Sequence, residues 1–240
     1  MNIQQRLAAL HQRMAGACRA AGRPPDAVTL LAVGKAQPVA ALAAARDAGV
    51  RDFAENYVQE ALAKIAALPR EGLRWHFIGP LQSNKAAAVA QHFDWVHSVD
   101  REKIAQRLSQ LRPPEAGVLN VCVQVNISGE ASKSGVAPAD AAALCRAVAA
   151  LPRLRLRGLM AIPAPAKKRG QSPFSERTEN DDSPRRPYRQ LRELLESLNK
   201  EGFELDTLSA GMTDDFEAAI AEGSTMIRIG TALFGDRPKT

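Results

Sequence analysis

The sequence is poor in cysteine and in aromatic residues. Its 240 residues include three cysteines, Cys18, Cys122 and Cys145, and aromatic residues make up 5% of the chain. The cysteines do not stand at metal-ligand spacing, and two of them lie in apolar or alanine-rich segments, so we expect buried, reduced thiols. Few aromatic residues and abundant alanine favour helices that pack closely on a sheet.

Long apolar runs are also absent. No stretch approaches the length of a membrane span, and residues 1–6 begin an amphipathic helix rather than the apolar core of a signal peptide. We therefore expect a cytoplasmic protein without a membrane partner. The histidines show no HExxH-like spacing, so the sequence predicts no metal site; they are His11, His76, His92 and His97.

The charge balance is basic, with a formal net charge of +6. The lysines and arginines are scattered along the predicted helices and are not interleaved with aromatic residues, as a nucleic-acid surface would require. We therefore expect no nucleic-acid partner. A surface of this charge attracts anionic small molecules.

Helical and strand patterns alternate along the chain. Short apolar runs rich in β-branched residues predict strands at 28–34, 51–54, 74–78, 94–97, 118–125, 154–161, 205–208 and 225–229. Amphipathic segments predict helices at 2–21, 38–48, 57–67, 83–91, 100–111, 138–150, 188–200 and 214–221, before a terminal segment at 231–235. This order predicts an α/β protein of one domain over residues 1–240, a (β/α)8 TIM-type barrel with an extra N-terminal helix. An open doubly wound sheet is the alternative, because the count depends on short strands.

One polar, proline-containing segment interrupts the alternation. Residues 163–187 carry charges of both signs and follow the sixth predicted strand. We expect a mobile surface loop within the single domain rather than a domain boundary.

Lys35 follows the first predicted strand directly. In a barrel, residues just past the carboxyl ends of the strands form the ligand site. Partial desolvation there lowers the pKa of a lysine and makes its neutral amine a nucleophile that forms a Schiff base with an aldehyde. The alternative is a lysine whose stem packs on apolar surface while its ammonium group stays in water.

Two further segments suit a phosphate. Residues 209–215 follow the seventh predicted strand and open a helix, with small residues and a threonine, although Asp214 and Asp215 can equally be helix caps. Residues 228–235 follow the eighth strand, where Gly230 permits close approach. If Arg228 points into the barrel, its guanidinium must find acceptors, because it cannot lose its charge; otherwise it is an exposed arginine at a strand end.

Seven ordered segments resemble the pyridoxal phosphate (PLP) homeostasis proteins, a family of small PLP-binding proteins similar in fold to the N-terminal barrel of alanine racemase. The segments are LLAVGKAQP at 30–38, FAENYVQE at 53–60, HFIGPLQSNK at 76–85, VNISGEASKSGV at 125–136, GLMAIPAP at 158–165, LSAGMTDDFEAAI at 208–220 and STMIRIGTALFG at 224–235. The resemblance covers nearly the whole chain. It implies that PLP is the cofactor.

The resemblance also implies roles for individual residues. Lys35 matches the lysine that forms the Schiff base with PLP, and Arg228 matches the arginine that faces the pyridine nitrogen. The phosphate-binding positions match Thr213, Gly230 and Thr231, and the same loop contains Ser209, Gly211 and Met212. Asn56 and His76 lie in family motifs near the cofactor, although Asn56 can also be a helix cap and His76 a core histidine.

The chain departs from the family in two places. It has Gly34 and Ala36 on either side of Lys35, where the family usually has serine and threonine, so it lacks the hydroxyl groups that flank the lysine. The segment at 163–187 is also longer and less regular than in the family.

The same comparison bears on catalysis. An arginine opposite the pyridine nitrogen keeps that nitrogen unprotonated, which weakens the cofactor as an electron sink. Racemisation also needs a second acid–base group, which in alanine racemase is a tyrosine of another domain; neither Tyr57 nor Tyr188 is an evident substitute. We expect a monomeric carrier that stores, buffers or delivers PLP, with apo PLP-dependent enzymes as partners. The alternative is a weak amino-acid racemase in which Tyr57, His76 or a water serves the second face.

Overall fold

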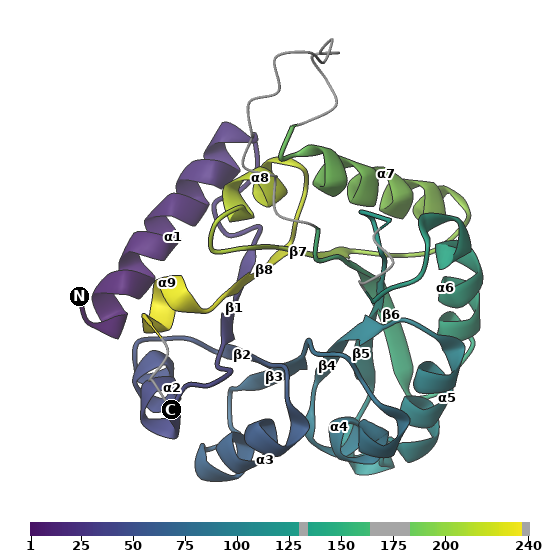
Figure 1. The fold of residues 1–240 in the computed structure, drawn as a ribbon, viewed down its shortest axis with the longest axis horizontal. Helices are drawn as coiled ribbons and strands as arrows, with labels where there is room; N and C mark the ends of the chain where they lie inside the picture. Colours follow the sequence, from purple (N-terminus) through teal and green to yellow (C-terminus); the bar gives the residue numbers. More distant parts are fainter. Residues whose placement is uncertain (130–133, 164–182, 237–240) are drawn as a thin grey trace, which may run out of the picture.

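The chain forms a closed parallel barrel surrounded by helices, in a computed structural model that describes residues 1–129, 134–163 and 183–236 (Figure 1). The strands pair in chain order, and the eighth pairs with the first. They are β1 (Thr29–Val33), β2 (Asp52–Glu55), β3 (Arg74–Phe77), β4 (Trp95–Val99), β5 (Leu119–Gln124), β6 (Leu154–Met160), β7 (Thr207–Met212) and β8 (Met226–Ile229). The predicted barrel is confirmed, and the open sheet is excluded.

Helices follow the strands around the outside of the barrel (Figure 1). They are α1 (Ile3–Ala20), α2 (Val39–Asp47), α3 (Val58–Ala67), α4 (Ala86–His92), α5 (Glu102–Leu111), α6 (Ala141–Ala149), α7 (Arg186–Lys200), α8 (Phe216–Ala221) and α9 (Thr231–Phe234). Short 3-10 turns precede α4 and α6, at η1 (Ser83–Lys85) and η3 (Pro138–Asp140), and another, η2 (Pro114–Ala116), follows α5.

The predicted N-terminal helix is α1, which begins at a capping box. The Asn2 side chain accepts from the amide of Gln5, whose own side chain accepts from the amide of Asn2. Its buried residues recur at helical spacing on one face and are Leu7, Leu10, Met14 and Cys18. This face packs on α8 and α9, which lie beside α1 in Figure 1.

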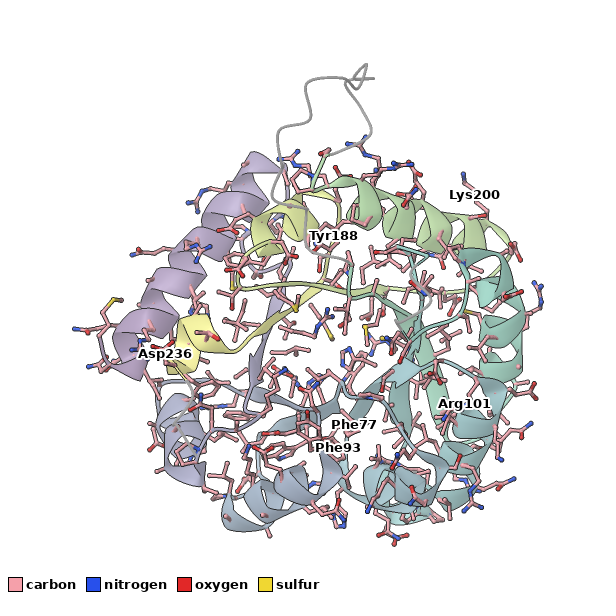
Figure 2. The ribbon with its side chains drawn as sticks, in the orientation of Figure 1. Phe77, Phe93, Arg101, Tyr188, Lys200 and Asp236 are labelled. Carbon is pink, nitrogen blue, oxygen red and sulfur yellow. The ribbon has the colours of Figure 1, made fainter. Side chains whose placement is uncertain are left out.

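Apolar side chains form two regions, one outside the sheet and one inside the barrel. In the outer region, Phe77 of β3 meets the edge of Phe93 after α4, with ring centroids 5.5 Å apart (Figure 2). The inner region holds two small apolar clusters, one around Leu31 and one around Trp95. The interior of this barrel also contains buried polar side chains that can form hydrogen bonds, among them His76, His97, Ser209 and Arg228.

The seventh strand is longer than predicted. The sequence predicts a strand at 205–208 followed by a loop, but β7 continues to Met212 and α8 begins only at Phe216. Ser209, Gly211 and Met212 therefore belong to a strand, and their predicted place in a loop is wrong. The pairing of β7 with β8 shifts register between Ser209 and Met212, so the strand passes Gly211 in a bulge.

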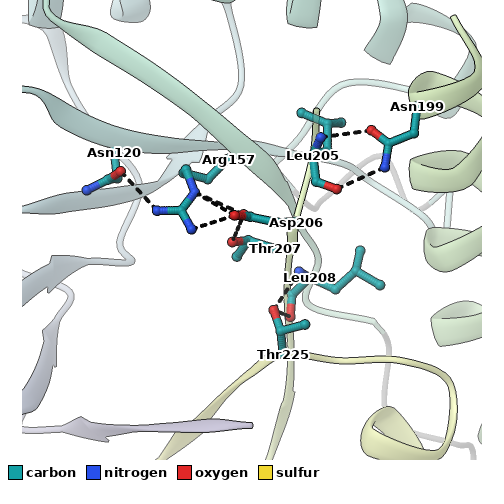
Figure 3. Close-up of polar contacts among 8 residues, drawn as sticks. All are labelled: Asn120, Arg157, Asn199, Leu205, Asp206, Thr207, Leu208 and Thr225. Atoms are coloured by element: carbon teal, nitrogen blue, oxygen red, sulfur yellow. Dashed lines mark hydrogen bonds and ion pairs between the residues drawn. The ribbon is translucent and has the colours of Figure 1, made fainter. Parts of the chain in front are cut away.

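Polar contacts hold the amino-terminal end of β7 in place (Figure 3). Arg157 of β6 donates to Asp206, with Nη2 2.6 Å from Oδ2, and Asn199 of α7 bonds both the amide and the carbonyl of Leu205. These bonds fix where β7 starts, and hence where Ser209 lies in the barrel.

The segment predicted as a mobile loop, 163–187, falls mostly outside the described residues. In its described part, α7 already begins at Arg186. Within the ranges described above, no helix is long and apolar enough to cross a membrane.

Candidate functional site

Lys35 lies in a turn just after β1, at the carboxyl end of the barrel, and is partly exposed. Bonds to both neighbouring peptides hold this turn. Lys64 Nζ donates to the carbonyl of Gly34 at 2.6 Å, and Glu60 Oε1 accepts from the amide of Ala36 at 2.6 Å. Ala36 has a φ of 58°, a left-handed conformation that a side chain disfavours. The position of Lys35 is therefore imposed by groups on α3.

A buried ion-pair network lies beneath this turn. Lys64 Nζ is 2.7 Å from Glu55 Oε1 and 2.6 Å from Glu60 Oε1. Burial raises the pKa of Glu55 to about 7, against the opposing effect of Lys64. A Cβ at position 34 would lie 2.5 Å from Glu55 Oε1, so glycine lets the network reach the Lys35 turn.

The sequence did not identify Lys64 or Glu60 as part of the site. Both lie in α3, and the sequence alone does not show whether these positions face the barrel or the solvent. One pattern in the sequence could have indicated this ion-pair network. Glu60 and Lys64 stand four residues apart in a helix that follows a strand ending in Glu55.

Asn56 follows β2 and is not a helix cap, because Tyr57 occupies the N-cap position of α3 and makes no side-chain cap bond. Asn56 Oδ1 is buried without a hydrogen-bond partner among the residues that the structure describes. A buried oxygen of this kind is costly unless a ligand or a water donates to it. Asn56 therefore offers an acceptor at the carboxyl end of the barrel.

Arg228 points into the barrel and is 4% exposed, so it is not an exposed arginine at a strand end. Its Nη1 donates to the carbonyl and to Oγ of Ser209, at 2.7 and 3.0 Å, and its Nη2 donates to the carbonyl of Ala161 at 2.9 Å. Burial lowers the pKa of Arg228 to about 10, which leaves it charged at neutral pH. In the described part of the chain, no carboxylate lies within ion-pair distance of it. Among the described residues, the hydrogen bonds that orient this buried charge come from neutral oxygens.

The two segments predicted to bind phosphate lie next to each other, because β7 pairs with β8 and Met212 is in register with Arg228. Thr213 follows β7 and is partly exposed, while Thr231 begins α9 and is exposed. A Cβ at Gly230 would meet Val33 only at ordinary contact distance, 3.6 Å. The contacts around position 230 therefore do not exclude a side chain there.

The two aspartates after Thr213 do not cap α8 with their side chains. Asp215 is the N-cap residue, but its Oδ1 accepts from the amide of Met212 at 2.6 Å, and its Oδ2 accepts from the hydroxyl of Tyr188 at 2.6 Å. Asp215 therefore closes the turn after β7 and ties it to α7, where Tyr188 lies (Figure 2).

His76 is completely buried inside the barrel, and both of its ring nitrogens have partners. Nε2 is 3.0 Å from Asp52 Oδ1, and Nδ1 is 3.0 Å from Nε2 of His97. The interpretation of His76 as a buried histidine with hydrogen-bond partners is therefore correct. The sequence predicts His97 at the end of a strand, but it lies inside β4. Its interior position could not be predicted, because its partners, His76 and Ser209, come from other strands.

Neither tyrosine is placed as an acid–base group in the barrel. Tyr57 is 64% exposed, and Tyr188 is buried with its hydroxyl bound to Asp215. Burial and the hydrogen bond to Asp215 raise the pKa of Tyr188. The cysteines are buried thiols, as predicted. Among the residues described, no cluster of histidine, cysteine and acidic side chains could hold a metal ion.

Comparisons with known proteins agree over nearly the whole chain. The family model described as alanine racemase, N-terminal domain, matches residues 5–238. The pyridoxal phosphate homeostasis protein of Pseudomonas aeruginosa is 56% identical over 235 residues, which cover 98% of this chain and 96% of that protein.

Solved structures give the same result. PipY of Synechococcus elongatus PCC7942 without PLP has a TM-score of 0.81 and 37% sequence identity, over 98% of this chain and 100% of that one. PipY with PLP bound has a TM-score of 0.76 and 36% identity, again over 98% of this chain and 100% of that one.

Proposed function

Because this chain belongs to the family of pyridoxal phosphate homeostasis proteins, which share the barrel of the alanine racemase N-terminal domain, we propose that it binds PLP and serves intracellular PLP homeostasis. One structural observation supports this most strongly. Lys35 follows β1 and Arg228 lies in β8, and these two strands are paired, with Leu31 in register with Arg228. An amine at the barrel mouth and a buried cation inside it thus stand on neighbouring strands.

The residues present fit PLP. Lys35 would supply the amine for the aldehyde, Arg228 the cation for the ring nitrogen, and Gly230 with Thr213 and Thr231 the phosphate site. The buried oxygen of Asn56 supplies a further acceptor. Bound PLP supplies an aldehyde carbon and an electron-withdrawing ring.

Lys35 would hold PLP through a Schiff base. Its neutral amine would condense with the aldehyde of the cofactor, with the aldehyde oxygen lost as water and a C=N bond in place of the C=O bond. Lys64 and Glu60 bind the Gly34 carbonyl and the Ala36 amide, and so hold the backbone that carries Lys35. Hydrolysis of that C=N bond would release the cofactor.

A carrier role is favoured over racemisation. A racemase needs a second acid–base group opposite the lysine. His76 has both ring nitrogens engaged inside the barrel, Tyr57 is exposed, and Tyr188 is bound to Asp215. The protein then stores, buffers or delivers PLP as a cytoplasmic monomer, with apo PLP-dependent enzymes as recipients.

The absorption spectrum of the purified protein tests PLP binding. With PLP added, the wild type gains a visible band that borohydride removes, and Lys35→Ala lacks this band. Lys103→Ala, which alters an exposed lysine of α5, is the matched control and keeps it. An identical band in Lys35→Ala would contradict the assignment of Lys35.

Two further measurements separate carrier from enzyme. Net racemisation of an amino acid, with solvent deuterium incorporated at its α-carbon, would contradict the carrier role. Transfer of PLP to an apo-enzyme faster than its release into buffer would support delivery, and equal rates would argue against it.

A further inference from the structure

A line of hydrogen-bonded side chains crosses the interior of the barrel. It starts at Asp52, where β2 begins, and passes through His76 of β3 and His97 of β4 to Ser209 of β7; we call these four residues the polar chain. The successive distances are 3.0 Å from Asp52 to His76, 3.0 Å between the histidines and 2.8 Å from His97 Nδ1 to Ser209 Oγ. Ser209 in turn accepts from Arg228.

The carboxylate at one end sets the direction of every bond. The guanidinium of Arg74 donates to both oxygens of Asp52, at 2.6 and 2.7 Å. Burial opposes the charge of Asp52, but the bonds from Arg74 and His76 outweigh it and lower the pKa of this carboxyl. Asp52 is therefore an acceptor only, and Nε2 of His76 must carry the proton.

The same logic continues along the polar chain. Burial lowers the pKa of His76, and burial with the nearby charge of Arg228 lowers that of His97 well below its usual value, so both rings are neutral. A neutral His76 with a proton on Nε2 accepts at Nδ1, so His97 donates from Nε2 and accepts at Nδ1. The Ser209 hydroxyl must then donate to His97, which leaves its lone pairs facing Arg228.

The alternative arrangement would hold Arg228 less firmly. If His97 carried its proton on Nδ1, the Ser209 oxygen would accept from both His97 and Arg228, and no bond to His97 would direct the hydroxyl proton of Ser209 away from the guanidinium. Replacing these four residues by apolar side chains would also fill the barrel, as such interiors usually are filled. The polar chain, in which every member is hydrogen-bonded, is therefore best explained by its effect on the Arg228 guanidinium at its end.

We propose that Asp52, His76 and His97 are positioning residues, which hold Ser209 as an acceptor and so fix the guanidinium that faces the ring nitrogen of PLP. The inference rests on the proposed function. With Arg228 held in this way, a second positive charge beside it is disfavoured, and the ring nitrogen stays unprotonated. A residue at the amino-terminal end of the barrel thus controls the electronic state of a cofactor at the other end.

The cofactor-free protein tests the first half of the proposal. Nitrogen-15 NMR of the imidazole rings should show both His76 and His97 neutral, with the proton on Nε2. A charged ring, or a proton on Nδ1 of either histidine, would overturn the direction of the polar chain.

The second half is tested with PLP that carries nitrogen-15 in its ring. Asp52→Leu should shift the ring-nitrogen resonance toward that of the protonated pyridine, whereas Asp52→Asn keeps an oxygen for His76 and should restore the wild-type position. Asp94→Leu is the matched control, because Asp94 bonds the Trp75 amide and Arg70 at the same end of the barrel, outside the polar chain. Unfolding curves of all variants report whether each is folded.

The outcomes separate the two proposals. If the wild type forms no borohydride-sensitive adduct, the proposed function is wrong and this inference falls with it. If the adduct forms but Asp52→Leu leaves the ring nitrogen unchanged, or Asp94→Leu shifts it equally, only the inference is overturned.

Discussion

The ionisation of Glu55 opposes folding. This residue is fully buried, and its pKa lies near 7 in the folded protein against 4.5 for an ordinary glutamate. The folded state therefore binds more protons than the unfolded state between these values, and the free energy of unfolding falls as the pH rises through that range. This difference in pKa corresponds to a loss of about 3 kcal/mol in the free energy of unfolding.

This predicts the behaviour of Glu55→Gln. Glutamine cannot ionise, so the variant should lose less stability than the wild type between pH 4.5 and 7, by up to about 3 kcal/mol. Urea unfolding at several pH values measures the difference. Glu71→Gln, in the exposed loop before β3, should keep the wild-type slope. Parallel curves for the wild type and Glu55→Gln would show that Glu55 does not titrate in this window.

At the scale of the elements, the register of the sheet depends on close approach between strands. Gly158 of β6 pairs with Thr207 of β7, and a Cβ at position 158 would lie 1.8 Å from the carbonyl oxygen of Thr207. Ser209 follows two residues later on the same strand. The contact between β6 and β7 thus places one end of the polar chain.

We expect Gly158→Ala to force β6 and β7 apart and to lower the free energy of unfolding by about 3 kcal/mol or more. Gly16→Ala is the opposite case, because position 16 lies inside α1 and, apart from the helix's own backbone, no atom of the described residues lies within 4 Å of the new Cβ. That variant should gain about 0.5–1 kcal/mol from helix propensity. Urea unfolding of the two variants compares them, and equal stabilities would contradict the packing argument.

The strands show why the sequence predicts some boundaries and not others. The apolar runs at 28–34 and 118–125 correspond to β1 and β5, because burial on both faces leaves a continuous apolar pattern. The sequence predicts the end of β7 too early, at position 208, because a glycine such as Gly211 is typical of a turn. In the structure, Gly211 has a φ of 96°. Only the pairing of β7 with β8 shows that this glycine lies in a bulge inside a strand.

At the scale of the whole molecule, PLP should bind the closed barrel and not the unfolded chain, because the segments that carry Lys35 and Arg228 become neighbours only when β1 pairs with β8. A ligand at about 100 times its Kd adds about 2.7 kcal/mol to the free energy of unfolding. For a domain of this size, we expect Tm to rise by about 5–10 °C.

Thermal unfolding with and without PLP measures this shift. Pyridoxine 5'-phosphate carries the phosphate and ring but no aldehyde, so it should raise Tm less than PLP does. In Lys35→Ala, the two ligands should give the same small increase. A full PLP shift in Lys35→Ala would mean that the bond to Lys35 contributes nothing to binding.

The sequence by itself determined the order of strands and helices and the place of Lys35 after the first strand, and it favoured a closed barrel over an open sheet. These follow from local periodicity and from the rule that ligand sites lie at the carboxyl ends of barrel strands. Its family motifs also marked His76 and Arg228.

Only the tertiary structure decided what those side chains touch. His76 meets Asp52 across 24 positions, and His97 meets Ser209 across 112 positions. Contacts of this kind depend on strand register and on which face of each strand turns inward, and a shift of one residue would reverse that face. The sequence therefore shows which residues are available for chemistry, and barrel closure decides which of them form one connected chain.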